Sequence, residues 1–147
     1  MTVALRTASA VVAIVIAAAA VAGCSDHTAP HGSALTVRVI VPDVQLRPPG
    51  SVCYGTGAFA DVNPSGSFRL AAGRSTVTGS VPAGQAAKAY DKDFGHAAKV
   101  PTVCVLALTM ASVPAAVDYT LTVSGQAPVS FSAAQISGRT VTVTLPE

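Results

Sequence analysis

Three cysteines, Cys24, Cys53 and Cys104, are the residues whose type and placement give this sequence its clearest chemistry. Cys24 follows a short positive start that ends at Arg6 and then a charge-free stretch rich in Ala, Val and Ile. Small residues stand directly before it. A positive start, an apolar middle and a small-residue exit are typical of a secretory signal segment. The sequence therefore predicts that residues 1–23 direct the chain out of the cytoplasm.

The exit of this segment is the tetrapeptide VAGC (21–24), which resembles the lipobox of bacterial lipoproteins. The resemblance implies cleavage before Cys24, a diacylglycerol attached to its sulfur, and often acylation of the new amine. The alternative is an uncleaved anchor over residues 7–25, just long enough to span a bilayer. Alanine contributes little transfer free energy and no basic cluster fixes an orientation, so we expect the lipoprotein form.

Lipidation of Cys24 places the domain on the extracytoplasmic face of the cell membrane, with the membrane itself as a partner. Two acyl chains are enough for stable attachment without a basic patch. The remaining cysteines, Cys53 and Cys104, form an even pair outside the cytoplasm, which predicts a disulfide. Two buried thiols or a metal pair are the open alternatives, although no histidine stands at the spacing that a zinc site needs.

Composition limits the classes of partner and the number of domains. Without Arg6, eight basic residues face seven acidic ones, which is too balanced for an electrostatic nucleic-acid footprint. Residues 24–33 are polar and contain Pro and Gly, as expected of a flexible tether. Residues 34–147 then have the length of one domain.

Short alternating segments predict strands over residues 34–41, 67–81 (a hairpin), 102–110, 118–125, 129–131 and 139–145. Residues 42–51 contain three prolines and are expected to form a connection, and residues 82–100 to form the longest loop. Residues 102–110 are apolar on both faces, so we expect a central strand covered on both sides. One helical turn is predicted between Ser132 and Gly138, with Gln135 completing a capping box. The fold class is all-β, a small antiparallel β-sandwich.

The order CYGTGAFADV (53–62), CVLALTM (104–110), DYTLTV (118–123) and FSAAQI (131–136) resembles a group of uncharacterised actinobacterial, mycobacterial-type exported lipoproteins. That resemblance implies an exported location, a Cys53–Cys104 bridge and a packed Tyr119, and it carries no catalytic motif. The sequence also has a looser likeness to transthyretin-like sandwiches. The expected topology is therefore either immunoglobulin-like or transthyretin-like. The segment AAGR (71–74) replaces the Asp-x-x-Gly turn of the family.

No constellation of residues indicates an enzyme or a cofactor. His27 and His31 belong to the tether, and His96 to the longest loop. The pair Asp91 and Asp93 has part of a calcium-loop spacing, but its glycine comes too early and no glutamate closes the site. Asp61 is expected to cap the turn that precedes Pro64.

The sequence thus predicts a non-catalytic module that contacts an envelope protein or a cell-wall partner. The alternative is a carrier of a small apolar or lipid ligand between the two sheets. The oligomeric state is left open.

Overall fold

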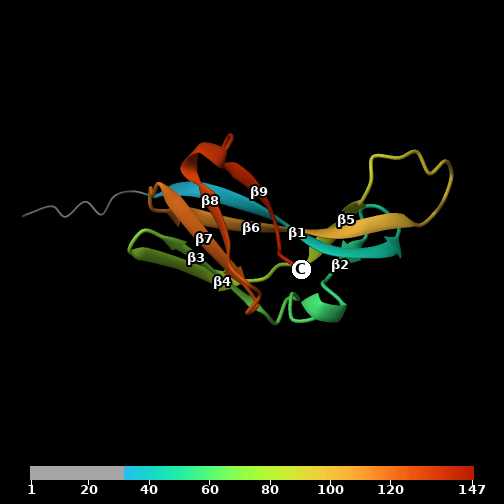
Figure 1. Ribbon diagram of the computed structural model, residues 1–147, viewed down its shortest axis with the longest axis horizontal. Coiled ribbons are helices and arrows are strands. Elements are labelled where there is room, and N and C mark those ends of the chain that lie inside the picture. Colours follow the sequence, from blue (N-terminus) through green and yellow to red (C-terminus); the bar gives the residue numbers. More distant parts are fainter. Residues whose placement is uncertain (1–31) are drawn as a thin grey trace, which may run out of the picture.

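Two β-sheets packed face to face form the part of the chain that the computed structural model describes, residues 32–147 (Figure 1). The predicted β-sandwich is confirmed. The predicted signal segment, Cys24 and nearly all of the predicted tether lie outside the described residues. Among residues 32–147, no helix is long and apolar enough to cross a bilayer.

The larger sheet has five strands, in the spatial order β2 (Val52–Cys53), β5 (Gly84–Lys88), β6 (Val100–Val113), β1 (Ser33–Arg47) and β9 (Thr140–Thr144). β1 runs antiparallel to β6 and parallel to β9. The smaller, fully antiparallel sheet has four strands, in the order β4 (Ser75–Ser80), β3 (Ser67–Ala72), β7 (Asp118–Val123) and β8 (Val129–Ser132).

The core lies between the sheets and is made of the side chains that alternation in the sequence predicts. β1 and β6 contribute Leu35, Val37, Val39, Val41, Cys104, Leu106, Leu108 and Met110, all buried. The smaller sheet contributes Phe68, Leu70, Tyr119, Leu121, Val123 and Phe131. Burial of this aliphatic surface is the main stabilising contribution.

The predicted turns are also present. Gly73, with φ +59°, begins the two-residue turn that joins β3 to β4, a left-handed conformation that glycine adopts without strain. The predicted helical turn is the 3₁₀ helix η2 (Ala133–Gln135). The backbone N–H of Ser132 donates to Oε1 of Gln135 at 2.8 Å, as the capping box requires.

Two predicted connections are wrong. Residues 42–47 were expected outside the sheet, but β1 continues through Pro42 to Arg47. Its register with β6 shifts between Val41 and Gln45, so Pro42 falls in a bulge, where its missing N–H breaks no ladder bond. The expected loop 82–100 contains β5, which pairs with β6, so that only residues 82–83 and 89–99 lie outside strands.

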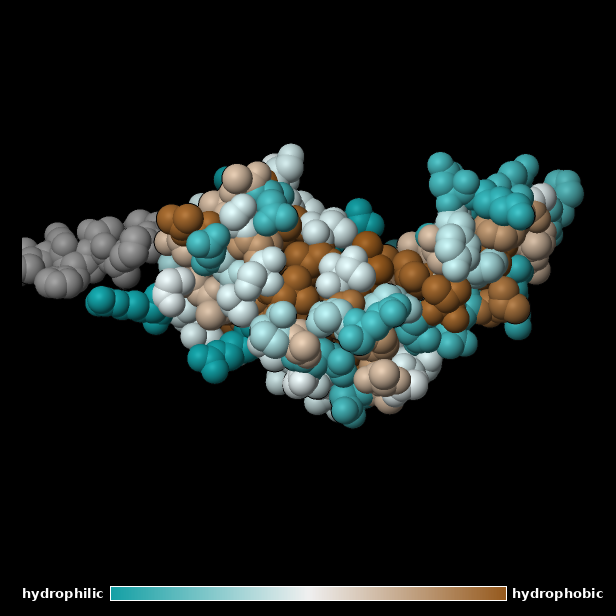
Figure 2. Space-filling model, in the orientation of Figure 1, coloured by the Kyte–Doolittle hydropathy of each residue, from teal (hydrophilic) through white to brown (hydrophobic). Residues whose placement is uncertain are grey.

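The far ends of β1 and β6 extend beyond the four-stranded sheet (Figure 1). Together with β2, β5 and the loop 89–99 they form a projection that we call the arm, residues 42–54 and 84–103. Figure 2 shows apolar residues continuing from the middle of the molecule into this projection. The arm is a single sheet layer that leaves the sandwich, so its outward side has no second sheet on it.

Tyr119, at the start of β7, is packed as the resemblance implied. Its ring stacks on Phe131 with centroids 5.2 Å apart, and its hydroxyl accepts the N–H of Ala116 at 3.1 Å. A tyrosine bonded to backbone a few residues upstream is a recurrent corner of Greek-key sandwiches.

Removing this hydroxyl in Tyr119→Phe is expected to lower the free energy of unfolding by about 1 kcal/mol, because the N–H of Ala116 loses its acceptor. Urea unfolding of the purified chain measures the change. The exposed Tyr90 supplies the matched control, and Tyr90→Phe should leave the midpoint in place. An equal loss in both variants would contradict this role for the hydroxyl.

Candidate functional site

The outward side of the arm carries mostly aliphatic side chains, which lie next to one another on neighbouring strands. Strand register places eight residues on this side, opposite the buried face of Cys104: Leu46, Val52, Gln85, Ala87, Pro101 and Val103 in the arm, with Ile40 and Val105 at its base. We call this set the outer arm face. Its members range from half-buried to exposed, because no second layer covers them.

The exposed large hydrophobic residues of the described chain concentrate in the arm. Six large hydrophobic side chains are exposed, and five of them lie in the arm: Val44, Leu46, Val52, Tyr54 and Tyr90. Leu46 and Val52 are 67% and 64% exposed. Only Val117, in the loop before β7, lies elsewhere. Clustered exposed apolar residues mark a binding surface more often than scattered ones do.

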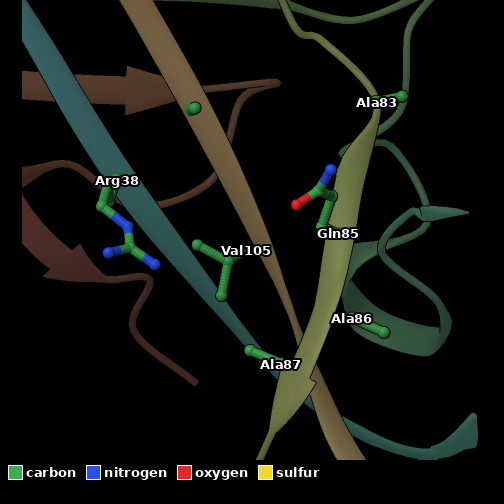
Figure 3. Close-up of a pocket in the computed structure, with 7 residues that line it drawn as sticks. Arg38, Ala83, Gln85, Ala86, Ala87 and Val105 are labelled. Carbon is green, nitrogen blue, oxygen red and sulfur yellow. The ribbon is translucent and has the colours of Figure 1, made fainter. Parts of the chain in front are cut away.

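A groove of about 380 Å³ lies at the inner end of this face (Figure 3). Arg38 of β1 and Gln85 of β5 extend on either side of Val105, and the rest of the lining is alanine. The groove exists because Ala87 and Ala107 leave the space between the two longer side chains open. The groove therefore offers a ligand the positive charge of Arg38 and the amide of Gln85 at the edge of an aliphatic surface.

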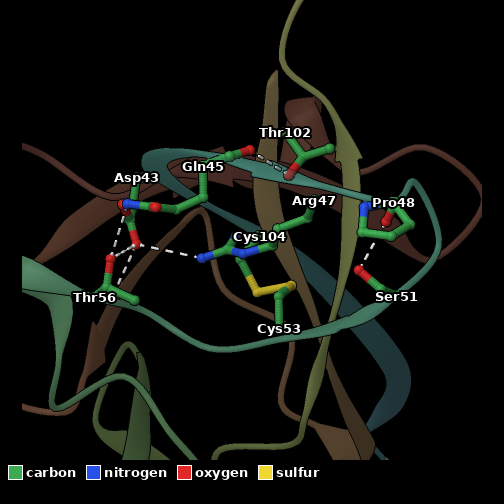
Figure 4. Close-up of a disulfide and its surroundings, with 9 residues drawn as sticks. All are labelled: Asp43, Gln45, Arg47, Pro48, Ser51, Cys53, Thr56, Thr102 and Cys104. Carbon is green, nitrogen blue, oxygen red and sulfur yellow. Dashed lines mark hydrogen bonds and ion pairs between the residues drawn. A yellow bond between two sulfur atoms is a disulfide. The ribbon is translucent and has the colours of Figure 1, made fainter. Parts of the chain in front are cut away.

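The inward side of the arm is held together by the Cys53–Cys104 disulfide (Figure 4). This bridge is the one that the cysteine count predicted, and its Cα atoms are 5.7 Å apart. It joins β2 to β6 across β5, where Gly84 leaves room for it. A Cβ on Gly84 would lie 2.4 Å from Sγ of Cys104, so no larger residue fits without displacement.

A polar cluster beside the disulfide fixes the bulged part of β1 to the loop before the 3₁₀ helix η1 (Gly57–Phe59) (Figure 4). Asp43 accepts the backbone N–H of Thr56 at 2.8 Å, the hydroxyl of Thr56, and the amide of Gln45 at 2.9 Å. Nη2 of Arg47 lies 3.8 Å from Oδ2 of Asp43. The side chain of Asp43 is only 10% exposed.

Burial alone would raise the pKa of Asp43. The bonds from Gln45 and Thr56, together with the positive charge of Arg47, outweigh this effect and hold the pKa below its ordinary value of 3.8. The donors from Gln45 and Thr56 are directed at the carboxylate, and no histidine is among its contacts, whereas the buried Nη1 of Arg47 has no hydrogen-bond partner. The cluster therefore serves as a clamp on the arm rather than as an acid–base centre.

Asp43→Asn is expected to lower the free energy of unfolding at neutral pH by about 1 to 3 kcal/mol, because a charged acceptor of several hydrogen bonds is lost. A carboxylate with a depressed pKa stabilises the fold above its unfolded-state pKa and stops doing so as pH falls through its folded value. The difference between the two proteins should therefore shrink below about pH 4. Urea unfolding at a series of pH values measures it, and a constant difference down to pH 2 would contradict the role of Asp43.

The other sequence-predicted candidates do not assemble into a site. Asp91, Asp93 and His96 are exposed in the loop 89–99, and Asp93 accepts the N–H of Gly95 at 2.8 Å. Within residues 32–147, no group of three or more His, Cys, Asp or Glu side chains is placed to hold a metal ion. Asp61 is exposed as well.

Asn63, and not Asp61, caps the turn before Ser65. Its Oδ1 accepts the backbone N–H of Ser65 at 2.9 Å. A second, smaller pocket of about 110 Å³ lies at the opposite end of the molecule from the arm, where β1 begins, and is lined by Leu35, Val113, Tyr119 and Ile136 among others. Lipidation at Cys24 lies outside the described residues and stays a prediction.

The sequence signal for the outer arm face is the strand 102–110, whose two faces are both apolar. This pattern predicts cover on both sides. The structure covers the side of Cys104 and Leu106, whereas Val103 and Val105 are half-buried and Ala107 is exposed. The prediction of a doubly covered strand is therefore wrong within the described residues, and its failure is what locates the candidate surface.

Comparison with protein-family models, with curated proteins and with solved structures finds no match for this chain.

Proposed function

We propose that this chain is a non-catalytic lipoprotein of the bacterial cell envelope, anchored through Cys24, whose arm is an interaction surface for a protein partner. The proposal includes membership of the exported actinobacterial group that the sequence resembles. The observation that carries the interaction role is the concentration of exposed large hydrophobic residues in the arm, two of which, Leu46 and Val52, lie on the outer arm face.

The position of the arm supports this role. Ser33 and Leu46 are at opposite ends of β1, about 40 Å apart for thirteen residues of extended chain. A domain tethered through the residues before Ser33 can thus present the arm well away from its attachment point. The disulfide and the Asp43 clamp stiffen the base of the arm, which lowers the entropy lost when a partner binds.

The second candidate function is a carrier that holds an apolar ligand between the sheets. Such a carrier needs an internal cavity of several hundred Å³. The larger groove lies on the outward side of the five-stranded sheet, whereas the inward side chains Val39, Leu106 and Leu121 have no exposed surface. Close packing between the sheets favours the interaction module.

Attachment is tested with Cys24→Ala in cells that express the full chain. We expect complete loss of metabolic lipid labelling and release of the protein from the membrane fraction. Normal labelling of the variant would refute anchoring through Cys24 and would leave the role of the arm unaffected.

The interaction role is tested by chemical cross-linking in the same cells, followed by affinity purification. Val52→Asp should abolish the adducts formed by the unaltered chain, because a carboxylate cannot be buried in an aliphatic contact without a large desolvation cost. Val117→Asp is the matched control, since Val117 is exposed outside the arm. Identical adducts in all three proteins would overturn the proposal.

A further inference from the structure

We infer that the free edge of β6 beside the Arg38 groove binds the extended C-terminal tail of a partner protein. The tail adds to the larger sheet as a strand, and its terminal carboxylate lies next to Arg38. This inference goes beyond the proposed function, because the edge belongs to the sandwich and not to the arm. An empty strand position, a set of unpaired backbone groups and the charge at the end of the edge carry it.

The larger sheet lacks a strand over part of the sandwich. β5 pairs with β6 only along residues 102–105, so beyond them β6 has a strand partner on its β1 side alone within the described chain. Over residues 106–109 the larger sheet therefore has three strands, whereas the smaller sheet has four. Because β8 lies against β9 at one side of the sandwich, β4 at the other side has no strand of the larger sheet opposite it (Figure 1).

The side chains of β4 that face the other sheet show the effect of this gap. Register pairs Val77 of β4 with Leu70 of β3, and Ser75 with Ala72, so each pair shares one face of the smaller sheet. Leu70 and Ala72 are buried, whereas Val77 is half-buried and Ser75 is exposed. A strand added next to β6 would cover this inner side of β4.

The hydrogen bonds of β5 fix which backbone groups of β6 point to this edge. Ala86 donates its N–H to the carbonyl of Ser51 at 2.8 Å and accepts the N–H of Gly50 at 2.7 Å, so its backbone is directed at β2. Residues that bond to one neighbour alternate along an antiparallel strand, so Gln85 and Ala87 bond to their partners on β6. The residues of odd number in β6 therefore direct their N–H and C=O to the β5 side.

Where β5 is absent, the same alternation leaves the backbone groups of Ala107 and Thr109 without a partner among residues 32–147. The other neighbour of β6 agrees with this assignment. Thr36, the register partner of Thr109, donates its N–H to the carbonyl of Arg139 at 2.9 Å and so bonds toward β9. Two donors and two acceptors are thus available to an added strand, which is how peptides bind to an exposed sheet edge.

This edge carries none of the usual protections against pairing. Natural edges are blocked by charged residues, prolines or bulges. Residues 106–110 are LALTM, with neither a charge nor a proline, and their register with β1 is regular. A register shift occurs only beyond Met110, so we call residues 106–110 the free edge.

The end of the free edge selects a chain terminus over an internal segment. An antiparallel strand added to β6 runs in line with β5 and in the same direction, so its C-terminal end arrives at Gly84. Residues 81–83 join β4 to β5 at this point, and Ala83 lines the groove. They obstruct further extension in the plane of the sheet, so the bound chain ends here.

The charge at this end fits a carboxylate. Arg38 is the register partner of Ala107, and its guanidinium extends toward Val105 across the groove (Figure 3). Among residues 32–147 the one ion pair is Arg47–Asp43, so Arg38 has no carboxylate there. An added strand lies two strand spacings from β1, about 10 Å, which a long arginine side chain can largely bridge. A strand added in the parallel sense would instead bring its terminal ammonium to Arg38, which is repulsive.

The bound tail has side chains in two environments. Those opposite Leu108 and Met110 face the inner side of β4, where Val77 is half-buried, and are expected to be aliphatic or aromatic. Those opposite Ala107 and Thr109 face solvent, because both of these residues are exposed. The ligand is therefore a protein tail with alternating apolar and polar residues and a free α-carboxylate.

Peptide binding to the purified full chain, made without the lipid, tests the inference. The probe is a pool of fluorescein-labelled hexapeptides in which threonine alternates, in both phases, with valine, isoleucine, leucine or phenylalanine. One pool has a free C-terminal carboxylate and a second has a C-terminal amide. Fluorescence anisotropy measures the affinity of each pool.

We expect saturable binding of the acid pool and about tenfold weaker binding of the amide pool, because the amide cannot form a charge-assisted hydrogen bond with Arg38. Arg38→Gln should weaken binding of the acid pool about tenfold and leave that of the amide pool unchanged. Arg69→Gln is the matched control, since Arg69 is an exposed arginine of β3 on the smaller sheet.

Thr109→Pro should weaken binding of both pools at least about tenfold, because it removes a donor that the added strand needs. This N–H has no partner in the described part of the chain, so no ladder bond is broken. Thr78→Pro is the matched control on β4. The N–H of Val81 donates to the carbonyl of Gly66, so by alternation the N–H of Thr78 points away from β3. Urea unfolding verifies the fold of both variants.

Hydrogen exchange of the unaltered chain locates the bound peptide even if Thr109→Pro does not fold. The acid pool should slow exchange at the amides of Ala107 and Thr109. The amide of Leu108 bonds to β1 and should exchange slowly with or without peptide.

Three results would each overturn the inference. They are no saturable binding of the acid pool up to about 1 mM, equal affinity for the acid and amide pools, and binding without slower exchange at Ala107 and Thr109. None of them bears on the arm, whose role is tested separately by cross-linking. Val52→Asp should leave peptide binding unchanged, because Val52 lies in β2 at the far side of β5.

Discussion

Replacing Cys53 and Cys104 together with alanine should lower the free energy of unfolding by about 4 kcal/mol. The bridge closes a loop between residues 51 positions apart, so the unfolded chain without it gains a large amount of conformational freedom. Both cysteines are also buried, and their removal leaves space beside Gly84. Because domains are stabilised by about 5 to 15 kcal/mol in total, a large share of the stability is lost.

Urea unfolding of the purified chain under non-reducing conditions measures this effect. In protein made without the lipid, Cys24→Ala removes a cysteine outside the disulfide and should leave the unfolding free energy unchanged. The arm should be affected most, because β2 and β5 are attached to the sheet next to the bridge. Hydrogen exchange should therefore become faster in residues 84–88 than in β3 and β7. A loss of less than about 1 kcal/mol would contradict the loop-closure account.

Leu106→Ala should lower the free energy of unfolding by about 3 to 5 kcal/mol. Leu106 is in the centre of β6, faces the smaller sheet and has no exposed surface. Truncation removes the transfer free energy of the isobutyl group and leaves a cavity that two hydrogen-bonded sheets cannot easily close.

Leu46→Ala is the matched control for this substitution. It makes the same chemical change in the same sheet, but at a side chain that is 67% exposed in the single chain. At low protein concentration its effect on unfolding should stay within about 0.5 kcal/mol. If Leu46→Ala and Leu106→Ala lowered the unfolding free energy equally, the difference in burial between the two faces of this sheet would be contradicted.

Much of the sandwich follows from the sequence because its strands alternate strictly. Val37 and Val39 in β1, and Leu121 and Val123 in β7, are all buried as their period of two predicts. The disulfide follows from the number of cysteines once Cys24 is assigned to the lipid. Hairpin turns and the Ser132–Gln135 cap follow from residues with specific local conformations.

The arm could not be predicted in the same way, because its strands depend on tertiary pairing. Pro42 normally interrupts a strand, and only a bulge opposite β6 allows β1 to continue past it. β5 has the sequence GQAAK, which lacks β-branched and aromatic residues. Gly84 is required by the disulfide, because Sγ of Cys104 occupies the space that a larger side chain would need.

The candidate site was missed for a related reason. Asp43 and Arg47 lie in a stretch whose prolines indicate a connection, so nothing in the sequence suggests that they pair. The outer arm face has a clear sequence signal in residues 102–110. A strand that is apolar on both sides does not, however, indicate whether the layer that covers its second side belongs to the same chain.

The placement of β1 between β6 and β9 has a consequence for biogenesis. A nascent polypeptide emerges with its N-terminus first, yet the partners of this first strand are residues 100–113 and 140–144. Pairing over such sequence separations is slow compared with local pairing. If the chain is exported as proposed, it would therefore stay unfolded until almost all of it has crossed the membrane, and the five-stranded sheet would close only after β9 arrives.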